Sequence, residues 1–230
     1  MPISKAMISV VIPTLNAGDG LAATLTALVP ASVAGIVREV IVADCGSSDA
    51  TLAIAEAAGA VIVPCQKGRG TQLHAGAAVA RAEWLLFLHA DTRLEHGWAD
   101  AAAAFMAAGV DKAAAFRFAL DDRGLSPRLL EWGVRLRCAL FRLPYGDQGL
   151  LLPAAFYREL GGYKPIPLME DVELVGRIGR GRLAMLGARA ITSAVRYRRD
   201  GYPGRVVRNL TCLALYYLRV PPARIAKLYG

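Results

Sequence analysis

The chain has 230 residues, of which 55% are hydrophobic and 20% are charged, and its formal net charge is +8. A hydrophobic content this high excludes a disordered chain, and a chain of this length can bury its own core as one large domain or two small ones. The charge is uneven, because residues 175–230 carry 12 Lys and Arg but one acidic residue, which indicates an anionic partner or a solvated basic surface.

The first half of the chain alternates short β-branched runs with Ala-rich helical stretches. Strands are expected over residues 8–12, 36–43, 60–63 and 84–88. Helices are expected over residues 18–28, 49–58, 70–81 and 97–108, with Asp49 as the N-cap of the second. This alternation predicts parallel βαβ units with right-handed crossovers. Ligands of such sheets bind beyond the carboxyl ends of the strands, so the polar residues that follow the strands are the candidate site.

The second half of the chain is less regular. Strands are expected over residues 113–120, 149–152, 182–186 and 191–195. Helices are expected over residues 126–141, 153–160, 170–178 and 205–218. No clear linker interrupts the chain, so we expect one domain. It would have a nucleotide-binding half (residues 1–95), an acceptor half (96–195) and a basic amphipathic tail (196–230).

Polar residues follow each of the first three expected strands. Thr14 and Asn16 come after the first strand, and Asp44 comes after the second. Asp44 can accept a hydrogen bond from a nucleobase or a ribose, or it can satisfy the amides of its own turn. The third strand leads into the Gly-bearing loop at residues 66–72, where Lys67 and Arg69 precede a helix. Such a loop attracts phosphate, although it lacks the P-loop spacing and can equally be a solvated turn.

The fourth strand is followed by His89 and Asp91. If the chain stays extended, both side chains point to the same side. A carboxylate here can hold Mg²⁺ or Mn²⁺ against a diphosphate, with phosphate oxygens and water as the other ligands. The imidazole can bind the same metal or a sugar hydroxyl.

Three acidic residues, Glu170, Asp171 and Glu173, lie at the start of the helix expected at residue 170. The helix dipole alone favours acidic residues there. A carboxylate in this position can also act as a general base on an acceptor hydroxyl. Repulsion between adjacent carboxylates can raise the pKa of one of them.

In this order and spacing, the segments resemble glycosyltransferase family 2 from Ile8 to about Gly181. The resemblance rests on SVVIPTLN (9–16), DCGSSDAT (44–51), HAD (89–91) and ED (170–171). Residues 89–92, 145–149 and 161–163 also resemble a small bacterial subgroup with a HADT metal motif. The family implies a GT-A fold. This is an α/β, Rossmann-like fold with a mostly parallel central sheet flanked by helices, here with a C-terminal helical extension.

The resemblance also implies an activity and roles for single residues. The chain would be an inverting, metal-dependent glycosyltransferase that moves a sugar from a nucleotide-sugar donor, most simply a UDP-sugar, to an acceptor hydroxyl. Asp44 would bind the nucleobase, Asp91 would bind Mg²⁺ or Mn²⁺, and Asp171 would be the base, with Glu170 beside it. His89 stands where the family has the first Asp of its metal motif, so it would bind the metal or the ribose. The further donor-binding residues would be Pro13, Thr14, Asn16, Lys67, Arg69 and Gln72.

The tail has two interpretations. Basic residues from Arg196 to Arg208 precede the apolar stretch at residues 210–218. This pattern is typical of a helix lying on an anionic bilayer, which would suit a lipid-linked acceptor at the inner face of the cell membrane. It also fits a helix packed on the core or in a homodimer interface. No run of about 18 apolar residues predicts a membrane-spanning helix. The four cysteines form no CxxC pair, so we expect a cytoplasmic, reducing environment.

Two other functions stay open at this point. A nucleotidyltransferase on a related fold would have a Gly-rich loop after the first strand, and residues 13–16 lack it. A non-catalytic sugar-nucleotide-binding protein is favoured by His89 and opposed by Asp91, Glu170 and Asp171. No nucleic-acid partner is expected, because the basic segments lack interleaved aromatic residues and a recognition-helix pattern.

Overall fold

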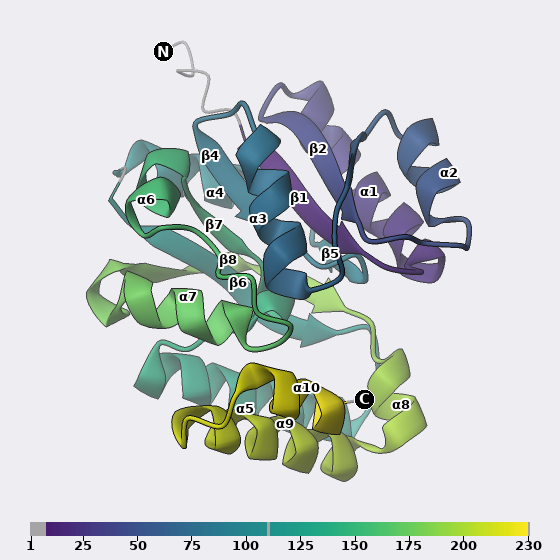
Figure 1. The fold of residues 1–230 in the computed structure, drawn as a ribbon. Coiled ribbons are helices and arrows are strands. Elements are labelled where there is room, and N and C mark those ends of the chain that lie inside the picture. The colour runs from purple at the N-terminus through teal and green to yellow at the C-terminus, as the bar shows by residue number, and fades with distance from the viewer. Residues whose placement is uncertain (1–7, 110, 230) are drawn as a thin grey trace.

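A computed structural model describes residues 8–109 and 111–229, which form one mixed sheet covered by helices (Figure 1). The strands are β1 Ile8–Thr14, β2 Val37–Asp44, β3 Val61–Pro64, β4 Trp84–Phe87, β5 Thr92–Leu94, β6 Ala113–Leu120, β7 Leu150–Pro153 and β8 Leu183–Thr192. Their order in the sheet is β3-β2-β1-β4-β7-β6-β8-β5. β7 runs antiparallel to β4 and β6, and β5 runs antiparallel to β8, whereas the other neighbours are parallel.

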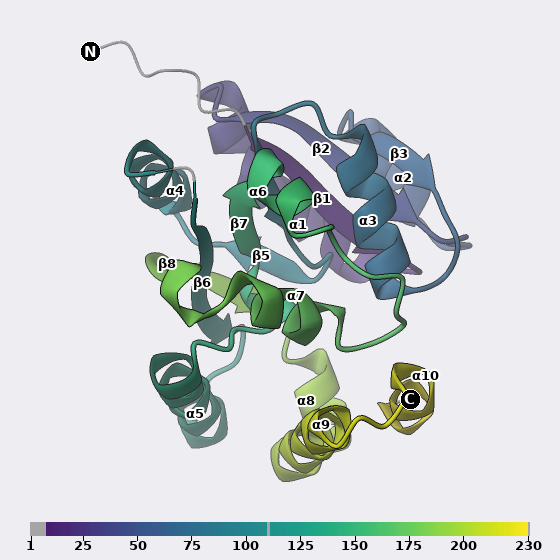
Figure 2. The same cartoon turned by 60° about the vertical axis from the view of Figure 1, so that its left-hand side comes forward.

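The helices cover both faces of the sheet and one end of it (Figures 1 and 2). The α-helices are α1 Gly18–Val33, α2 Thr51–Ala57, α3 Arg69–Val79, α4 Trp98–Ala107, α5 Leu125–Phe141, α6 Ala154–Glu159, α7 Glu170–Ile178, α8 Val195–Asp200, α9 Tyr202–Tyr217 and α10 Pro222–Tyr229. Two short 3-10 helices are η1 Gly146–Gln148 and η2 Arg180–Arg182. None of these helices has the length and apolar character needed to cross a bilayer.

The buried core explains why the unbroken apolar run of β1 becomes a central strand. Val10 and Ile12 pack in one cluster with residues of α1 and α4, whereas Val11 packs in a second cluster with residues of α3, α6 and α7. Successive side chains of a strand point to opposite faces, so both faces of β1 are buried. The strand therefore lies between two helical layers.

Two expectations for local structure are wrong. The strands expected at residues 182–186 and 191–195 form one strand, β8, because a register shift opposite Ala115 and Arg117 absorbs the Gly-Ala step that interrupts the pattern. Residue 195 begins helix α8 instead. Asp49 is not the N-cap of α2, because the helix begins at Thr51 with Ala50 as its cap. Asp49 instead accepts hydrogen bonds from the backbone N–H groups of Gly18 and Thr51, so it ties the starts of α1 and α2 together.

The C-terminal helices pack on α7 and beside strand β6 of the sheet. Val172 of α7, Cys212 of α9 and Ile225 of α10 are buried in one cluster. Val134 of α5 packs in another cluster, together with residues of β6 and α8. Helix α9 nevertheless exposes Leu210 and other apolar side chains. Residues 196–230 therefore bury one side against the fold and expose apolar side chains on another. All four cysteines are free thiols.

Candidate functional site

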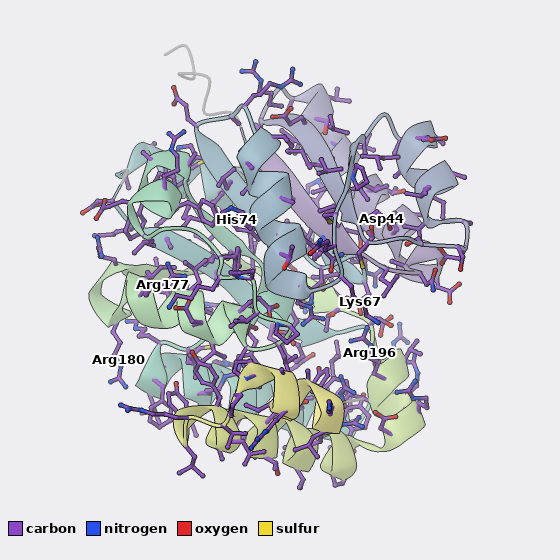
Figure 3. The ribbon with its side chains drawn as sticks, in the orientation of Figure 1. Asp44, Lys67, His74, Arg177, Arg180 and Arg196 are labelled. Carbon is purple, nitrogen blue, oxygen red and sulfur yellow. The ribbon has the colours of Figure 1, made fainter. Side chains whose placement is uncertain are left out.

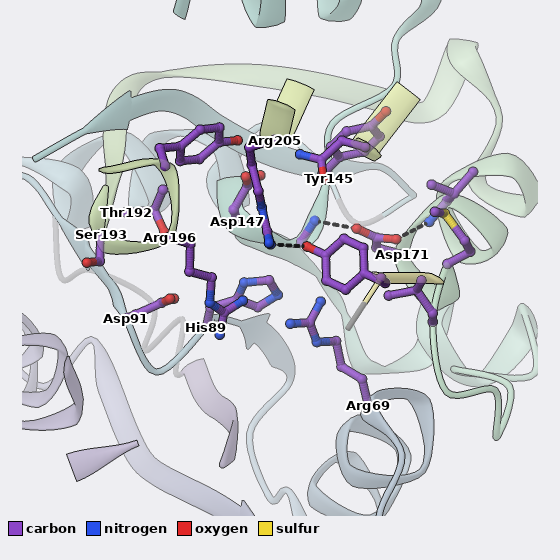
Figure 4. Close-up of a pocket in the computed structure, with 17 residues that line it drawn as sticks. Arg69, His89, Asp91, Tyr145, Asp147, Asp171, Thr192, Ser193, Arg196 and Arg205 are labelled. Carbon is purple, nitrogen blue, oxygen red and sulfur yellow. Dashed lines mark hydrogen bonds between the residues drawn. The ribbon is translucent and has the colours of Figure 1, made fainter. Parts of the chain in front are cut away.

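A cavity of about 100 Å³ lies where the carboxyl end of β4, η1 and the starts of α3 and α7 meet (Figure 4). Segments distant in the sequence line it together. The charged and polar residues of its wall are Arg69, His89, Asp91, Tyr145, Asp147, Asp171, Thr192, Ser193, Arg196, Tyr197, Arg205, Asn209 and Tyr229. The structure thus brings Arg69, His89, Asp91 and Asp171, four of the residues expected from the sequence, to one cavity.

His89 and Asp91 reach the cavity through a turn. Strand β4 ends at Phe87, and the backbone N–H of Thr92 donates to the carbonyl of His89 at 3.2 Å, so the chain is not extended there. The Asp91 carbonyl accepts from the Ser193 N–H at 3.0 Å, which fixes the turn to the end of β8. The extended chain on which the expectation for these two side chains depended is therefore absent, although both residues line the cavity.

The imidazole of His89 is uncharged at neutral pH. Burial, together with the positive charges of Arg69 and Arg196, lowers the pKa of His89 well below its ordinary value. A neutral imidazole has one nitrogen lone pair free to accept a hydrogen bond or to bind a metal ion. A Cβ added to Gly146 would lie 2.6 Å from Nε2 of His89, so only glycine allows the imidazole this position.

Asp171 and Glu170 are neighbours in sequence but have different surroundings. Asp171 lines the cavity, and its Oδ2 accepts from the Gly146 N–H at 2.7 Å. Glu170 is 1% exposed and lies 3.6 Å from the Nε of Arg69. Burial raises the pKa of Glu170 to about 8, and the charge of Asp171 adds to the rise, although Arg69 opposes it. The carboxyl of Glu170 is therefore largely protonated at neutral pH, whereas Asp171 is the one of the pair that meets the cavity.

Asp147 is a cavity residue that sequence reasoning did not select. It lies in η1, and its Oδ1 is buried without a hydrogen-bond partner among the described residues. Burial raises the pKa of Asp147 to about 6, and the charges of Asp171 and Asp91 add to that rise. The sequence signal for Asp147 is the Gly-flanked segment at residues 145–149, which resembles the bacterial subgroup.

The position of η1 is fixed by buried polar contacts. Arg137 of α5 lies over the ring of Tyr145 at 3.4 Å and donates to Gln148 Oε1 at 3.2 Å. Gln148 in turn donates from Nε2 to the carbonyl of Phe116 at 3.0 Å. These contacts hold Asp147 toward the cavity.

The C-terminal helices complete the cavity wall, which the sequence did not suggest. Arg196 comes from α8, Arg205 and Asn209 from α9, and Tyr229 from α10. Arg205 is buried, and it donates to the Tyr229 hydroxyl at 2.7 Å and to Asp200 at 3.2 Å. The three guanidinium groups of Arg69, Arg196 and Arg205 make the cavity attractive to an anion.

Asp44 and its neighbours lie outside the cavity wall and bond to one another. Asp44 accepts hydrogen bonds from the Thr14 and Ser47 hydroxyls and from the backbone N–H groups of Gly46 and Ser47. Burial raises the pKa of Asp44, but the hydrogen bonds from Ser47 and Thr14 outweigh it, so the pKa is lowered and the group is charged. Gln72 donates from its amide to the carbonyls of Thr14 and Ala43.

The other residues expected to bind the donor lie at the same edge. Asn16 has a positive φ of 49° and accepts from the Ser48 N–H at 2.9 Å. Pro13 is half-buried, and Lys67 is exposed. In the view of Figure 3, Lys67 lies between Asp44 and Arg196. Of the expected donor-binding residues, Arg69 and His89 therefore line the cavity, whereas Pro13, Thr14, Asn16, Asp44, Lys67 and Gln72 do not.

Comparisons with known proteins identify the family and the fold. The family model described as Glycosyl transferase family 2 matches residues 9–149. A search of curated protein sequences finds no match. Among solved structures, glucosyl-3-phosphoglycerate synthase of M. tuberculosis is similar, with a TM-score of 0.62 and 22% identity over 94% of this chain and 82% of that chain.

Two further structures have the same likeness. The Mycobacterium tuberculosis synthase in complex with Mn²⁺, UDP and glucosyl-3-phosphoglycerate has a TM-score of 0.57 and 20% identity, over 94% of this chain and 81% of that chain. TarS 1–349 of S. aureus has a TM-score of 0.61 and 17% identity, over 97% of this chain and 69% of that chain. The expected GT-A fold is therefore confirmed.

Proposed function

The chain belongs to glycosyl transferase family 2, and from this membership we propose that it transfers a sugar from a UDP-sugar to an acceptor hydroxyl with inversion at the anomeric carbon. The observation that carries the proposal is that Asp91 and Asp171 line one cavity (Figure 4). In the figure the two carboxylates lie toward opposite ends of the group of side chains, so a donor and an acceptor can meet between them. The similar M. tuberculosis structure that contains UDP supports the choice of donor.

The donor diphosphate would bind among the arginines that surround the cavity (Figure 4). One guanidinium group can donate two parallel hydrogen bonds to the oxygens of a phosphate. Arg69, Arg196 and Arg205 all line the cavity. Pockets for ligands of this kind have volumes of roughly 300–1,000 Å³, which is more than the cavity offers. The nucleoside would therefore extend beyond it, toward the edge where Asp44 and Lys67 lie.

A divalent cation, Mg²⁺ or Mn²⁺, fits the donor set of this cavity. Asp91 and the neutral His89 supply an oxygen and a nitrogen donor. Within residues 8–109 and 111–229, no three His, Cys, Asp or Glu side chains are grouped to hold a metal ion alone. Phosphate oxygens and water would complete the coordination. When bound, the ion would neutralise the charge that develops on the departing diphosphate.

Asp171 would remove the proton from the acceptor hydroxyl. A general base has to lie within hydrogen-bond reach of that proton in its ionised form. Asp171 meets the cavity, and the Gly146 N–H orients its Oδ2. The raised pKa of Glu170 makes this residue a poor base at neutral pH, so we assign it a positioning role toward Arg69.

The acceptor would be lipid-linked and reached at the inner face of the cell membrane.

Thermal-shift measurements with UDP, UDP-sugars and other nucleotides, each with and without Mn²⁺, test the donor and the metal together. We expect UDP to stabilise the protein in a Mn²⁺-dependent manner, and Asp91→Ala to abolish this effect. Asp111→Ala, at an exposed position outside the cavity, is the matched control and should keep it. An equal shift in Asp91→Ala would contradict the metal assignment. Asp171→Asn should keep the UDP response and lose transfer.

A further inference from the structure

A long apolar groove lies between α5 and α9. Its volume is about 1180 Å³, far larger than that of the cavity. Leu129, Leu136 and Leu140 of α5 form one wall, and Val206, Leu210 and Leu213 of α9 form the other. No described side chain fills this volume, so the groove can take an apolar ligand of considerable length.

The groove is continuous with the candidate active site. Tyr145, Asp147, Tyr197 and Asn209 line both the groove and the cavity. At this junction, Oδ1 of Asp147 and Oδ1 of Asn209 are buried and have no hydrogen-bond partner among the described residues. A buried polar atom without a partner costs free energy. Both atoms are hydrogen-bond acceptors, so the junction favours a ligand with a hydroxyl or another donor, next to a groove that favours an apolar chain.

The surroundings of the groove favour an amphiphile from a bilayer. Arg137, Arg142 and Arg180 lie along the groove and would attract an anionic bilayer surface. Beside it, α5 exposes Leu129 by 69% and Trp132 by 61%. A helix that presents leucine and tryptophan together with arginine is typical of the interface between a bilayer and water.

We propose that the groove binds the hydrocarbon chain of an anionic membrane lipid that serves as the acceptor. A hydroxyl of its head group would donate to Oδ1 of Asp147 or Asn209, the anionic group would lie near Arg137, and the hydroxyl that accepts the sugar would lie beside Asp171. This inference rests on the proposed glycosyltransferase function. A second copy of the chain is the other possible occupant, but a dimer contact gives no reason for the groove to open into the cavity or for two unpartnered polar atoms at the junction.

Alkyl phosphates of increasing chain length test the groove without knowledge of the natural acceptor. Octyl, decyl and dodecyl phosphate are titrated below their micelle concentrations, and binding is measured by isothermal titration calorimetry. Each added methylene that enters the groove should strengthen binding about fourfold, so each step of two carbons should give about fifteenfold. An affinity that does not depend on chain length would overturn the proposal.

Gly133 of α5 offers a matched pair of variants. It lines the groove, and a Cβ added to it would meet no atom within 4 Å. Gly133→Phe should fill the groove and weaken dodecyl phosphate binding at least about tenfold, because fewer methylenes are buried. Gly133→Ala changes the helix propensity in the same direction with little bulk, and it should bind as the original chain does. Equal binding by the two variants would overturn the groove as the chain site.

Flotation with vesicles tests the bilayer as the source of the lipid. Vesicles of phosphatidylglycerol and phosphatidylcholine should carry the protein, vesicles of phosphatidylcholine alone should not, and Gly133→Phe should reduce flotation relative to Gly133→Ala. Absence of flotation would overturn the membrane source. A dimer in light scattering that Gly133→Phe dissociates, without any chain-length dependence, would show a second copy in the groove. If UDP does not stabilise the original chain but alkyl phosphate binding still depends on chain length, the proposed function is refuted. The groove then remains the binding site of the hydrocarbon chain.

Discussion

Glu170 should make the stability of the fold depend on pH. The carboxyl is 1% exposed, its Oε2 has no hydrogen-bond partner among the described residues, and the nearest cation contact is Arg69 at 3.6 Å. Burial, assisted by the charge of Asp171, raises its pKa from the ordinary 4.5 to about 8. The folded protein therefore holds the proton of Glu170 more tightly than the unfolded chain does.

The size of this effect follows from the two pKa values. A difference between 4.5 and about 8 corresponds to about 5 kcal/mol, at 1.36 kcal/mol for each pH unit. The contribution is fully present below pH 4.5, where both states are protonated. It is lost as the pH rises toward and through 8, because the unfolded chain ionises first.

Glu170→Gln keeps the shape of the side chain and removes its titration. We expect the free energy of unfolding of the original chain, measured by urea denaturation at pH 5, 7 and 9, to fall relative to that of the variant, by up to about 5 kcal/mol. Glu159→Gln, at a largely exposed glutamate, should show the same pH dependence of the free energy of unfolding as the original chain. If the free energy of unfolding changes equally with pH in the original chain and in Glu170→Gln, the reasoning is refuted.

Three further predictions concern the cavity wall. Gly146→Ala should weaken Mn²⁺-dependent UDP binding in calorimetry, because the new methyl would lie 2.6 Å from Nε2 of His89 and displace the imidazole; an unchanged affinity would show that His89 does not contact the donor. Tyr229→Phe removes the hydrogen bond from Arg205 and should cost about 1–3 kcal/mol, seen as faster amide exchange in α10, whereas unchanged protection would contradict this role of the hydroxyl. Mn²⁺ affinity measured with UDP present should rise as the pH passes about 6, because Asp147, which lines the same cavity as Asp91, ionises there. Asp147→Asn should remove that rise. A rise of equal size in the variant would assign it to another group.

The fold of the first half of the chain could be predicted from the sequence because its signals are local. Ile8–Ile12 is buried on both faces, as an unbroken apolar run between two turn signals predicts. Lys67 and Arg69 follow β3 and sit at the start of α3, as the Gly-bearing loop indicated. Each of these features depends on residues that lie within one strand–helix unit.

The remainder of the site depends on contacts between distant segments. Asp147 meets Asp171 and Asp91 only because β7 inserts antiparallel between β4 and β6, and no local pattern encodes that order. Arg205 reaches the cavity because α9 packs on α7 and α10 through Cys212. In the sequence, the basic and apolar residues around Arg205 are as typical of a helix on a membrane surface as of a helix packed on the fold. Tertiary packing therefore decides which of these residues belong to the site.

A crystal structure of the protein with UDP and Mn²⁺ tests the central claim most directly. We predict Mn²⁺ at Asp91, the diphosphate among Arg69, Arg196 and Arg205, and Asp171 unligated across the cavity, with space for an acceptor hydroxyl. Diphosphate bound elsewhere, or Mn²⁺ held without Asp91, would contradict a transfer reaction in this cavity.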